Sequence, residues 1–183
     1  MNIPMPTGRF VIPEKIVTHF HLKEGDVAAD FGAGSGYFLR VLSAGVGASG
    51  RVYACEIQKQ LVEKLGDVAR SQGLMNIDPL WCDLEAAGGI RISDNTLDVG
   101  LLINTFFQFE NKEVAIKEIH RTLRPGGILH VVDWTESFGG LGPHPEQVVD
   151  PETTKAHFES HGFLFERGYD AGDHHFAHAY RKL

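Results

Sequence analysis

The chain has 183 residues, of which 43% are hydrophobic and 22% charged, a composition typical of one globular domain spanning residues 1–183. Its net charge of −7 argues against a broad phosphate-binding surface, so nucleic acid is not an expected partner. The first ten residues lack the apolar core of a secretory signal, and the longest apolar run, Val99–Phe107, is too short to span a bilayer. We therefore expect a cytoplasmic protein, with Cys55 and Cys82 as reduced thiols and no metal site.

Short apolar runs alternate with segments of helical periodicity in the first half of the chain. Pro13 is suited to the first turn of a helix. Strands are expected at Val27–Phe31, Arg51–Glu56 and Ile77–Cys82, and helices at Tyr37–Ala44 and Gln58–Ser71. This alternation predicts a parallel sheet that is covered by helices on both faces.

The same alternation continues and then changes. A strand at Leu97–Ile103 and a helix at Lys112–Leu123 precede a strand at Ile128–Trp134, with Pro125-Gly126-Gly127 ending the helix. After the Gly/Pro loop Ser137–Pro145, Asp150 is suited to cap a helix that ends at Gly162. The runs Phe163–Tyr169 and His174–Arg181 then predict an antiparallel hairpin. The fold class predicted is α/β, Rossmann-like and doubly wound.

A glycine-rich loop follows the first expected strand. It reads Asp30-Phe31-Gly32-Ala33-Gly34-Ser35-Gly36, with an acid two residues before the first glycine. Glycines there let a ligand approach the backbone closely, next to the free N–H groups of a helix start. Dinucleotide-binding folds have the spacing G-x-G-x-x-G instead. An acid beside the loop suits a cationic head group better than a pyrophosphate, although a tight turn without a ligand is the alternative.

Two more acids end the second and third expected strands. Glu56 stands where a carboxylate can accept hydrogen bonds from ribose hydroxyls. Asp83 could accept from an adenine amino group while Leu84 packs against the ring. Taken singly, Glu56 could be a solvated acid at a strand end, and Asp83 could be a loop residue. Together with Asp30 they mark the carboxyl edge of the sheet, where open α/β sheets bind ligands.

These features, with the turn Arg121–Gly127 before the fifth strand, resemble the class I S-adenosylmethionine-dependent methyltransferases, and the small type-11/UbiE-like group in particular. The resemblance covers about residues 13 to 134. It implies a mostly parallel, seven-stranded sheet. The C-terminal hairpin would add the last strand to this sheet in the antiparallel direction. It also implies S-adenosyl-L-methionine as cofactor and methyl transfer to a small-molecule acceptor that the sequence does not identify.

The resemblance also assigns cofactor residues. Gly32, Gly34 and Gly36 would cradle the methionine portion, and Asp30 would help to hold its amino group. Glu56 would bind the ribose and Asp83 the adenine. The expected cofactor set is completed by Ala33, Ile57, Leu84 and Asn104.

The segment Asn104–Phe109 departs from the family, because many relatives carry a histidine there and this chain has none. No general base is therefore evident. A nonenzymatic S-adenosylmethionine-binding subunit that supports a partner protein is an alternative, and a nicotinamide-dependent oxidoreductase fits the glycine spacing less well.

The expected acceptor site lies beyond this segment. Asn104 and Gln108 could orient the acceptor, while Phe106 or Phe107 could wall its pocket; core packing and helix capping are the alternatives. Asp133, Trp134 and His174 are the other candidate acceptor residues. Gly139–Gly142 could close over the site as a lid.

Overall fold

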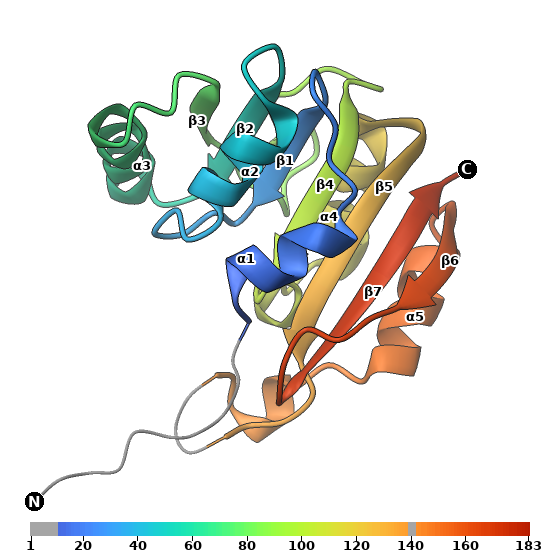
Figure 1. Cartoon of the computed structure of the whole chain (residues 1–183). Helices are drawn as coiled ribbons and strands as arrows, with labels where there is room; N and C mark the ends of the chain where they lie inside the picture. Colours follow the sequence, from blue (N-terminus) through green and yellow to red (C-terminus); the bar gives the residue numbers. More distant parts are fainter. Residues whose placement is uncertain (1–10, 139–141) are drawn as a thin grey trace, which may run out of the picture.

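The computed structural model of the chain describes residues 11–138 and 142–183. Its centre is one seven-stranded sheet with the order β3-β2-β1-β4-β5-β7-β6 (Figure 1). The strands are β1 Val27–Phe31, β2 Arg51–Glu56, β3 Ile77–Trp81, β4 Leu97–Ile103, β5 Leu123–Trp134, β6 Phe163–Gly168 and β7 His175–Lys182. Strands β1 to β5 run parallel, whereas β7 pairs antiparallel with both β5 and β6. The predicted fold class, including the antiparallel hairpin, is confirmed.

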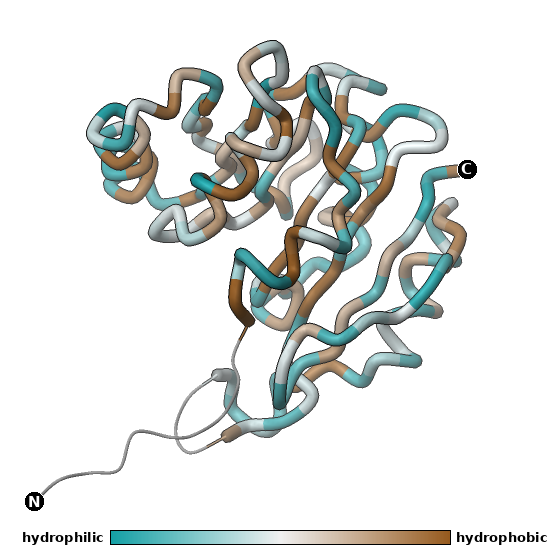
Figure 2. The backbone as a smooth tube through the Cα atoms, in the orientation of Figure 1, coloured by the Kyte–Doolittle hydropathy of each residue, from teal (hydrophilic) through white to brown (hydrophobic). Residues whose placement is uncertain are grey.

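Helices cover both faces of this sheet. They are α1 Pro13–Ile16, α2 Leu39–Val46, α3 Lys59–Ser71, α4 Lys112–Thr122 and α5 Pro151–Glu159, with short 3-10 turns η1 Val17–His19, η2 Phe106–Gln108 and η3 Pro145–Gln147. Buried side chains of α1, α2 and α3 form one hydrophobic cluster, and those of α4 and α5 belong to a second. Figure 2 shows the hydrophobic segments along the central strands, between these two layers.

Side chains cap the two helices of the second layer. The side chain of Asn111 accepts from the Val114 amide at 3.3 Å at the start of α4. Asp150 accepts from the Thr153 amide at 2.7 Å at the start of α5, and Pro151 follows it. Because each cap satisfies an amide that has no partner inside the helix, both helices begin at a defined residue.

Strand β5 begins earlier than the sequence predicted. Leu97 pairs with Leu123 and Val99 with Ile128, so residues 124–127 form a bulge between the two pairs. Gly126 adopts a φ of +78° in this bulge, a conformation that glycine tolerates well. Helix α4 thus ends at Thr122, before Pro125-Gly126-Gly127, and these three residues lie in the bulge of β5 and do not end the helix as expected.

Other element boundaries also shift. The first helix is a single turn that continues as the 3-10 turn η1, and α2 begins at Leu39 rather than Tyr37. The residues 139–141 of the expected lid lie outside the described ranges. Within those ranges, the chain contains no helix of the length and apolarity that a membrane crossing requires.

Candidate functional site

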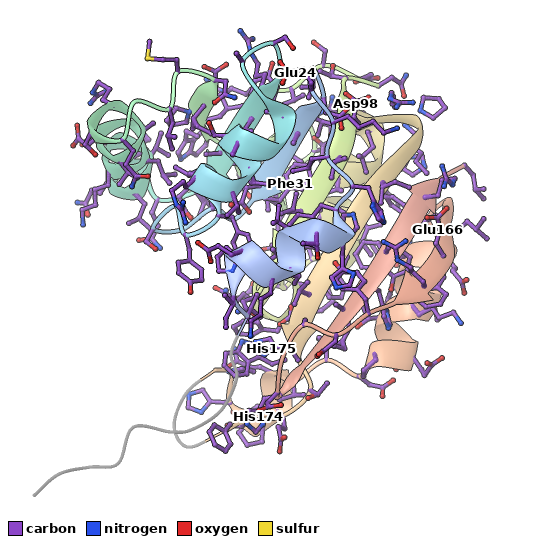
Figure 3. The ribbon with its side chains drawn as sticks, viewed as in Figure 1. Glu24, Phe31, Asp98, Glu166, His174 and His175 are labelled. Carbon is purple, nitrogen blue, oxygen red and sulfur yellow. The ribbon has the colours of Figure 1, made fainter. Side chains whose placement is uncertain are left out.

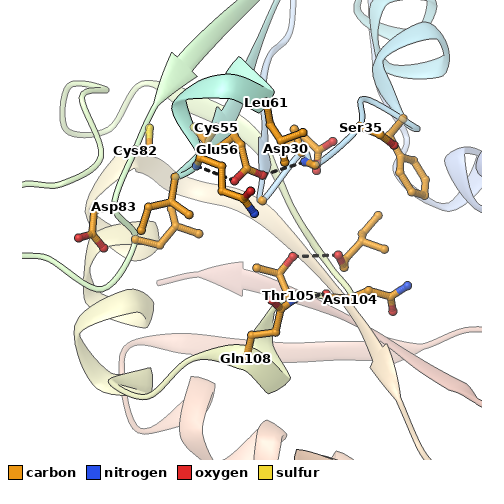
Figure 4. A pocket seen from close by; sticks show the side chains of 18 of the residues that line it. Asp30, Ser35, Cys55, Glu56, Leu61, Cys82, Asp83, Asn104, Thr105 and Gln108 are labelled. Carbon is orange, nitrogen blue, oxygen red and sulfur yellow. Dashed lines mark hydrogen bonds between the residues drawn. The ribbon is translucent and has the colours of Figure 1, made fainter. Parts of the chain in front are cut away.

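A pocket of about 510 Å³ opens at the carboxyl ends of β1, β2, β3 and β4 (Figure 4). These strand ends bring together residues that are far apart in the sequence. Nine of the ten predicted cofactor residues line it: Asp30, Gly32, Ala33, Gly34, Glu56, Ile57, Asp83, Leu84 and Asn104. The tenth, Gly36, is outside the lining. The pocket therefore lies where the strand-end acids predicted a ligand site.

The glycine loop is pinned to the neighbouring strand. The amides of Gly32 and Ala33 both donate to the Cys55 carbonyl at 2.9 Å. Gly32 has a φ of +87°, and a Cβ built on it would lie 2.6 Å from Thr105 Oγ1. Any larger residue would therefore be strained and would push against the segment that follows β4. Glycine is therefore required at position 32 both for close packing and for the backbone conformation.

Gly36 has a packing role in the structure. Its φ is +85°, and an added Cβ would lie 2.9 Å from Leu39 Cδ1 and 3.0 Å from Leu65 Cδ2. The missing side chain thus lets the loop pack closely on α2 and α3. Gly36 is therefore not among the residues that line the pocket, although it was expected to hold the cofactor.

The Glu56 carboxylate joins two segments of the pocket wall. One oxygen accepts from the Gly34 amide at 3.1 Å, and the other accepts from the Gln58 amide at 2.9 Å. The side chain is buried. Since a carboxylate has about four acceptor sites, these two bonds leave capacity for ligand hydroxyls.

Asp30 is the most deeply buried acid of the pocket. Only 3% of it is exposed, and burial raises its pKa to about 7, with a further contribution from the charge of Glu56. A cation bound beside it would favour the ionised form. The carboxylate pair Asp30 and Glu56 is thus suited to a positively charged ligand group.

The part of the pocket around Asp83 is lined by one carboxylate, a leucine and two thiols. Asp83 Oδ1 accepts from the Glu85 amide at 3.0 Å, and Leu84 is buried beside it. The free thiols of Cys55 and Cys82 line the same end, and the hydrogen bond between them, together with burial, raises the pKa of Cys55. Sequence reasoning missed these two as lining residues, although each directly precedes a predicted acid.

Aromatic and amide side chains border the pocket near the glycine loop and η2. Tyr37 is 64% exposed, and its ring meets that of Phe38 edge-on with centroids 5.8 Å apart. Gln108, a predicted acceptor residue, lines this pocket, and its Nε2 donates to the Asn104 carbonyl at 2.9 Å. Tyr37 was not predicted, and its position directly after Gly36 is the one signal that could have identified it.

The predicted acceptor residues Phe107 and Asp133 are outside the pocket lining. Asp133 is fully buried, and its Oδ2 accepts from the Phe107 amide at 3.0 Å. Its Oδ1 accepts from the Trp134 amide at 2.9 Å, while burial raises its pKa to about 6. Asp133 therefore anchors η2 from behind the pocket.

Trp134 and His174 are also outside the lining. They belong to an aromatic cluster at the carboxyl end of β5, where Figure 3 labels His174 and His175. His174 Nδ1 is 2.8 Å from Glu136 Oε1, and its ring stacks on Phe138 at 3.9 Å. The Trp134 ring packs on His175 with centroids 4.2 Å apart.

Comparisons with known proteins agree with this geometry. The family model described as "Methyltransferase domain" matches residues 29–131. Among curated proteins, the chain is 29% identical over 116 residues to the ubiquinone/menaquinone biosynthesis C-methyltransferase UbiE of Hydrogenovibrio crunogenus, covering 63% of this chain and 44% of that protein. The UbiE of Neisseria gonorrhoeae is 28% identical over 77% of this chain and 56% of its own length. The chain thus spans about half the length of these curated relatives.

Solved structures give the same result. A SAM-dependent methyltransferase from Aquifex aeolicus superposes with a TM-score of 0.87 at 29% identity, covering 95% of this chain and 91% of that one. A type 11 methyltransferase from Sulfolobus solfataricus, titled putative, has the same fold with a TM-score of 0.76 at 23% identity, covering 96% and 95%. The chain therefore belongs to the methyltransferase domain family and shares its Rossmann-like fold with the SAM-dependent methyltransferase from Aquifex aeolicus.

Proposed function

We propose that this chain transfers the methyl group of S-adenosylmethionine to a small-molecule acceptor that has an apolar part. One observation carries the proposal: a single pocket gathers the glycine loop and the three strand-end acids Asp30, Glu56 and Asp83. The name of the family supports the reaction, and the pocket supports the cofactor.

The residues of the pocket fit the cofactor from end to end. The buried carboxylate of Asp30 suits the ammonium of the methionine portion, and Gly32 with Gly34 leaves room for its backbone-like chain. Glu56 would accept from the ribose hydroxyls, while Asp83 would accept from the adenine amino group beside Leu84. When bound, the cofactor supplies an electrophilic methyl group on a positively charged sulfur.

Methyl transfer is an in-line displacement in which the acceptor lone pair forms the new bond while the carbon–sulfur bond breaks. Catalysis then depends mainly on alignment and on exclusion of water. The chain would contribute alignment through the glycine loop and through η2, which Asp133 holds in place. The rings of Tyr37 and Phe38 would shield the reacting atoms and contact the apolar part of the acceptor.

Two measurements test the proposal. Calorimetric titration should show binding of S-adenosylmethionine and S-adenosylhomocysteine, with no comparable affinity for NAD. Tritium-labelled methyl transfer should then be assayed against a metabolite panel that includes hydroquinones, because the curated relatives are named for carbon methylation in quinone biosynthesis. Tight NAD binding without binding of the sulfonium ligand would overturn the proposal. Cofactor binding without transfer to any compound would favour the nonenzymatic subunit instead.

A further inference from the structure

A second cavity, of about 330 Å³, opens at the opposite edge of the sheet, between the amino ends of β1 and β4 and the strands β5, β6 and β7. It has no lining residue in common with the cofactor pocket. Its volume is at the lower end of the range of roughly 300–1,000 Å³ for small-molecule sites. Although the whole chain carries a net charge of −7, four basic side chains border this cavity: Lys23, Arg124, Arg167 and Arg181.

The three acids that border the cavity are already engaged. Asp98 Oδ1 accepts from Arg124 Nε at 2.5 Å, and Glu166 forms an ion pair with Arg181; Figure 3 labels both acids. The third acid, Asp26, accepts from a backbone amide at 2.8 Å. Two of the four cations are thus neutralised by a neighbouring carboxylate. The other two, a lysine and an arginine, have no carboxylate partner among the described residues, so the cavity has positive charge available for an anion.

Arg167 is the more firmly held of these two cations. Its Nη2 donates to the His19 carbonyl at 2.9 Å and lies 3.0 Å from His21 Nε2. The guanidinium carbon also lies over the Tyr169 ring, 5.9 Å from its centroid. His21, which lines the cavity, has a φ of +52°, in the left-handed region that residues with a Cβ seldom adopt. Because the hydrogen bonds use one nitrogen of the guanidinium, its other N–H groups remain for a ligand.

His130 is a buried residue in the wall of the same cavity. Only 1% of it is exposed, and burial, together with the nearby charge of Arg167, lowers its pKa to about 3, so the ring is neutral near pH 7. Its Nδ1 lies 3.0 Å from the Tyr169 hydroxyl, whereas its Nε2 is buried without a hydrogen-bond partner among the described residues. When the hydroxyl donates to Nδ1, the ring proton is on Nε2, which is then an unused donor. Since buried polar groups are seldom left unpaired, His130 is a second, independent indication of a ligand.

We propose that this cavity binds a phosphate group, with Arg167 and Lys23 as its charged contacts and His130 Nε2 as a neutral donor. These three donors come from β6, from the loop before β1 and from β5. A phosphate group presents several acceptor oxygens in a tetrahedral arrangement and can receive donors from such different directions, whereas a carboxylate presents two oxygens in one plane. The ligand is either inorganic phosphate or a small phosphorylated metabolite. The site is additional to the proposed function and does not depend on it.

Calorimetry tests the site with three probes, inorganic phosphate, glycerol 3-phosphate and acetate, at low and constant ionic strength. The native chain should bind phosphate at one saturable site, at least tenfold more tightly than acetate. Arg167→Gln should weaken this binding about tenfold or more, the range for a hydrogen bond to a charged group. Lys23→Gln should weaken it several-fold without a change in Tm, because the Lys23 side chain is exposed. Tighter binding of glycerol 3-phosphate than of inorganic phosphate would identify a phosphorylated metabolite as the ligand, and the reverse order would identify inorganic phosphate.

Arg70→Gln is the matched control, because it removes the same charge from α3, where Arg70 pairs with Asp67 outside the cavity. It should leave the affinity for phosphate unchanged. His130→Phe keeps a ring against Phe20 and should weaken phosphate binding while leaving the affinity for S-adenosylhomocysteine unchanged. The inference is overturned if the native chain shows no saturable phosphate binding or if acetate binds as tightly. It is also overturned if Arg70→Gln weakens phosphate binding as much as Arg167→Gln does.

Discussion

At the scale of single residues, Glu56 combines a structural role with the ribose-binding role that we propose for it. Its two oxygens accept from the amides of Gly34 and Gln58 and so hold the glycine loop against the start of α3. Replacing Glu56 with alanine should therefore weaken S-adenosylmethionine binding by roughly 1.5–3 kcal/mol, the range for hydrogen bonds to a charged group. It should also lower the Tm, because two partly buried amides lose their acceptor. Calorimetry and thermal unfolding measure the two effects separately.

Asp83→Ala is the companion variant. Asp83 accepts from one backbone amide, that of Glu85, so its loss should disturb the fold less and should cost less binding energy than the loss of Glu56. If neither variant changes the dissociation constant for S-adenosylmethionine, the ribose and adenine assignments are wrong, while the fold remains as described.

The pocket acids could be predicted because each ends a strand of a parallel sheet, so their positions follow from the order of elements. The packing role of Gly36 could not, since it depends on Leu39 and Leu65, which approach only in the folded chain. Asp133 was predicted near the acceptor, but the sequence does not show that its carboxylate turns toward backbone amides. Side-chain direction and long-range hydrogen bonds are thus the part that sequence patterns leave open.

At the scale of elements, the short turn η2 depends on Asp133. The buried carboxylate accepts from the Phe107 amide of η2 and from the Trp134 amide that follows it. In Asp133→Asn an NH₂ group replaces one of these acceptors and faces a backbone N–H. We expect a loss of about 1–3 kcal/mol in the free energy of unfolding, with slower methyl transfer and a largely unchanged affinity for S-adenosylhomocysteine.

Asp98 gives the matched control for this prediction. Its Oδ2 accepts from the Val27 amide at 2.8 Å, at the start of β4 and outside the pocket lining. Asp98→Asn should also destabilise the chain but should leave turnover of the folded protein unchanged. Equal losses of turnover in the two variants would mean that Asp133 acts through general stability and not through η2.

The elements themselves were largely predictable, and their ends were not. Every predicted strand is present, because apolar runs bounded by turn residues are a local signal. The start of β5 shifted because Leu97 pairs with Leu123 across the bulge, a tertiary contact that a Pro-Gly-Gly pattern does not reveal. Likewise, α2 begins two residues late, since Tyr37 and Phe38 belong to the loop that borders the pocket.

At the scale of the whole molecule, we expect Asp30 to link fold stability to cofactor binding. Burial and the charge of Glu56 raise its pKa to about 7, whereas an aspartate in an unfolded chain titrates near 3.9. Between these pH values the folded chain keeps a proton that the unfolded chain has lost. The stability from this group is therefore present below about pH 4 and is lost as the pH rises toward 7, by up to about 1.4 kcal/mol per pH unit.

This sign leads to a prediction for the chain without cofactor. The Asp30→Asn side chain cannot titrate. As the pH rises from about 4 to 7, its free energy of unfolding should therefore increase relative to that of the native chain. Other buried groups, such as His130 and Asp133, titrate in both proteins and cancel in the difference. Denaturant unfolding of both proteins at several pH values measures this difference in free energy of unfolding. Parallel stability curves for the two proteins would show that Asp30 is not protonated in the folded chain.

Cofactor binding should have the opposite pH dependence. A positively charged ligand binds the ionised form of Asp30, so the affinity for S-adenosylmethionine should rise about tenfold between pH 6 and pH 8, following the ionised fraction of a group with a pKa of about 7. Asp30→Asn should bind more weakly and lose this dependence, whereas Asp83→Asn should keep it. Methylthioadenosine, which lacks the ammonium, should bind the native chain with little change over the same range. If S-adenosylmethionine binds equally well at both pH values, Asp30 does not contact its charged end, and another acceptor must hold the ammonium.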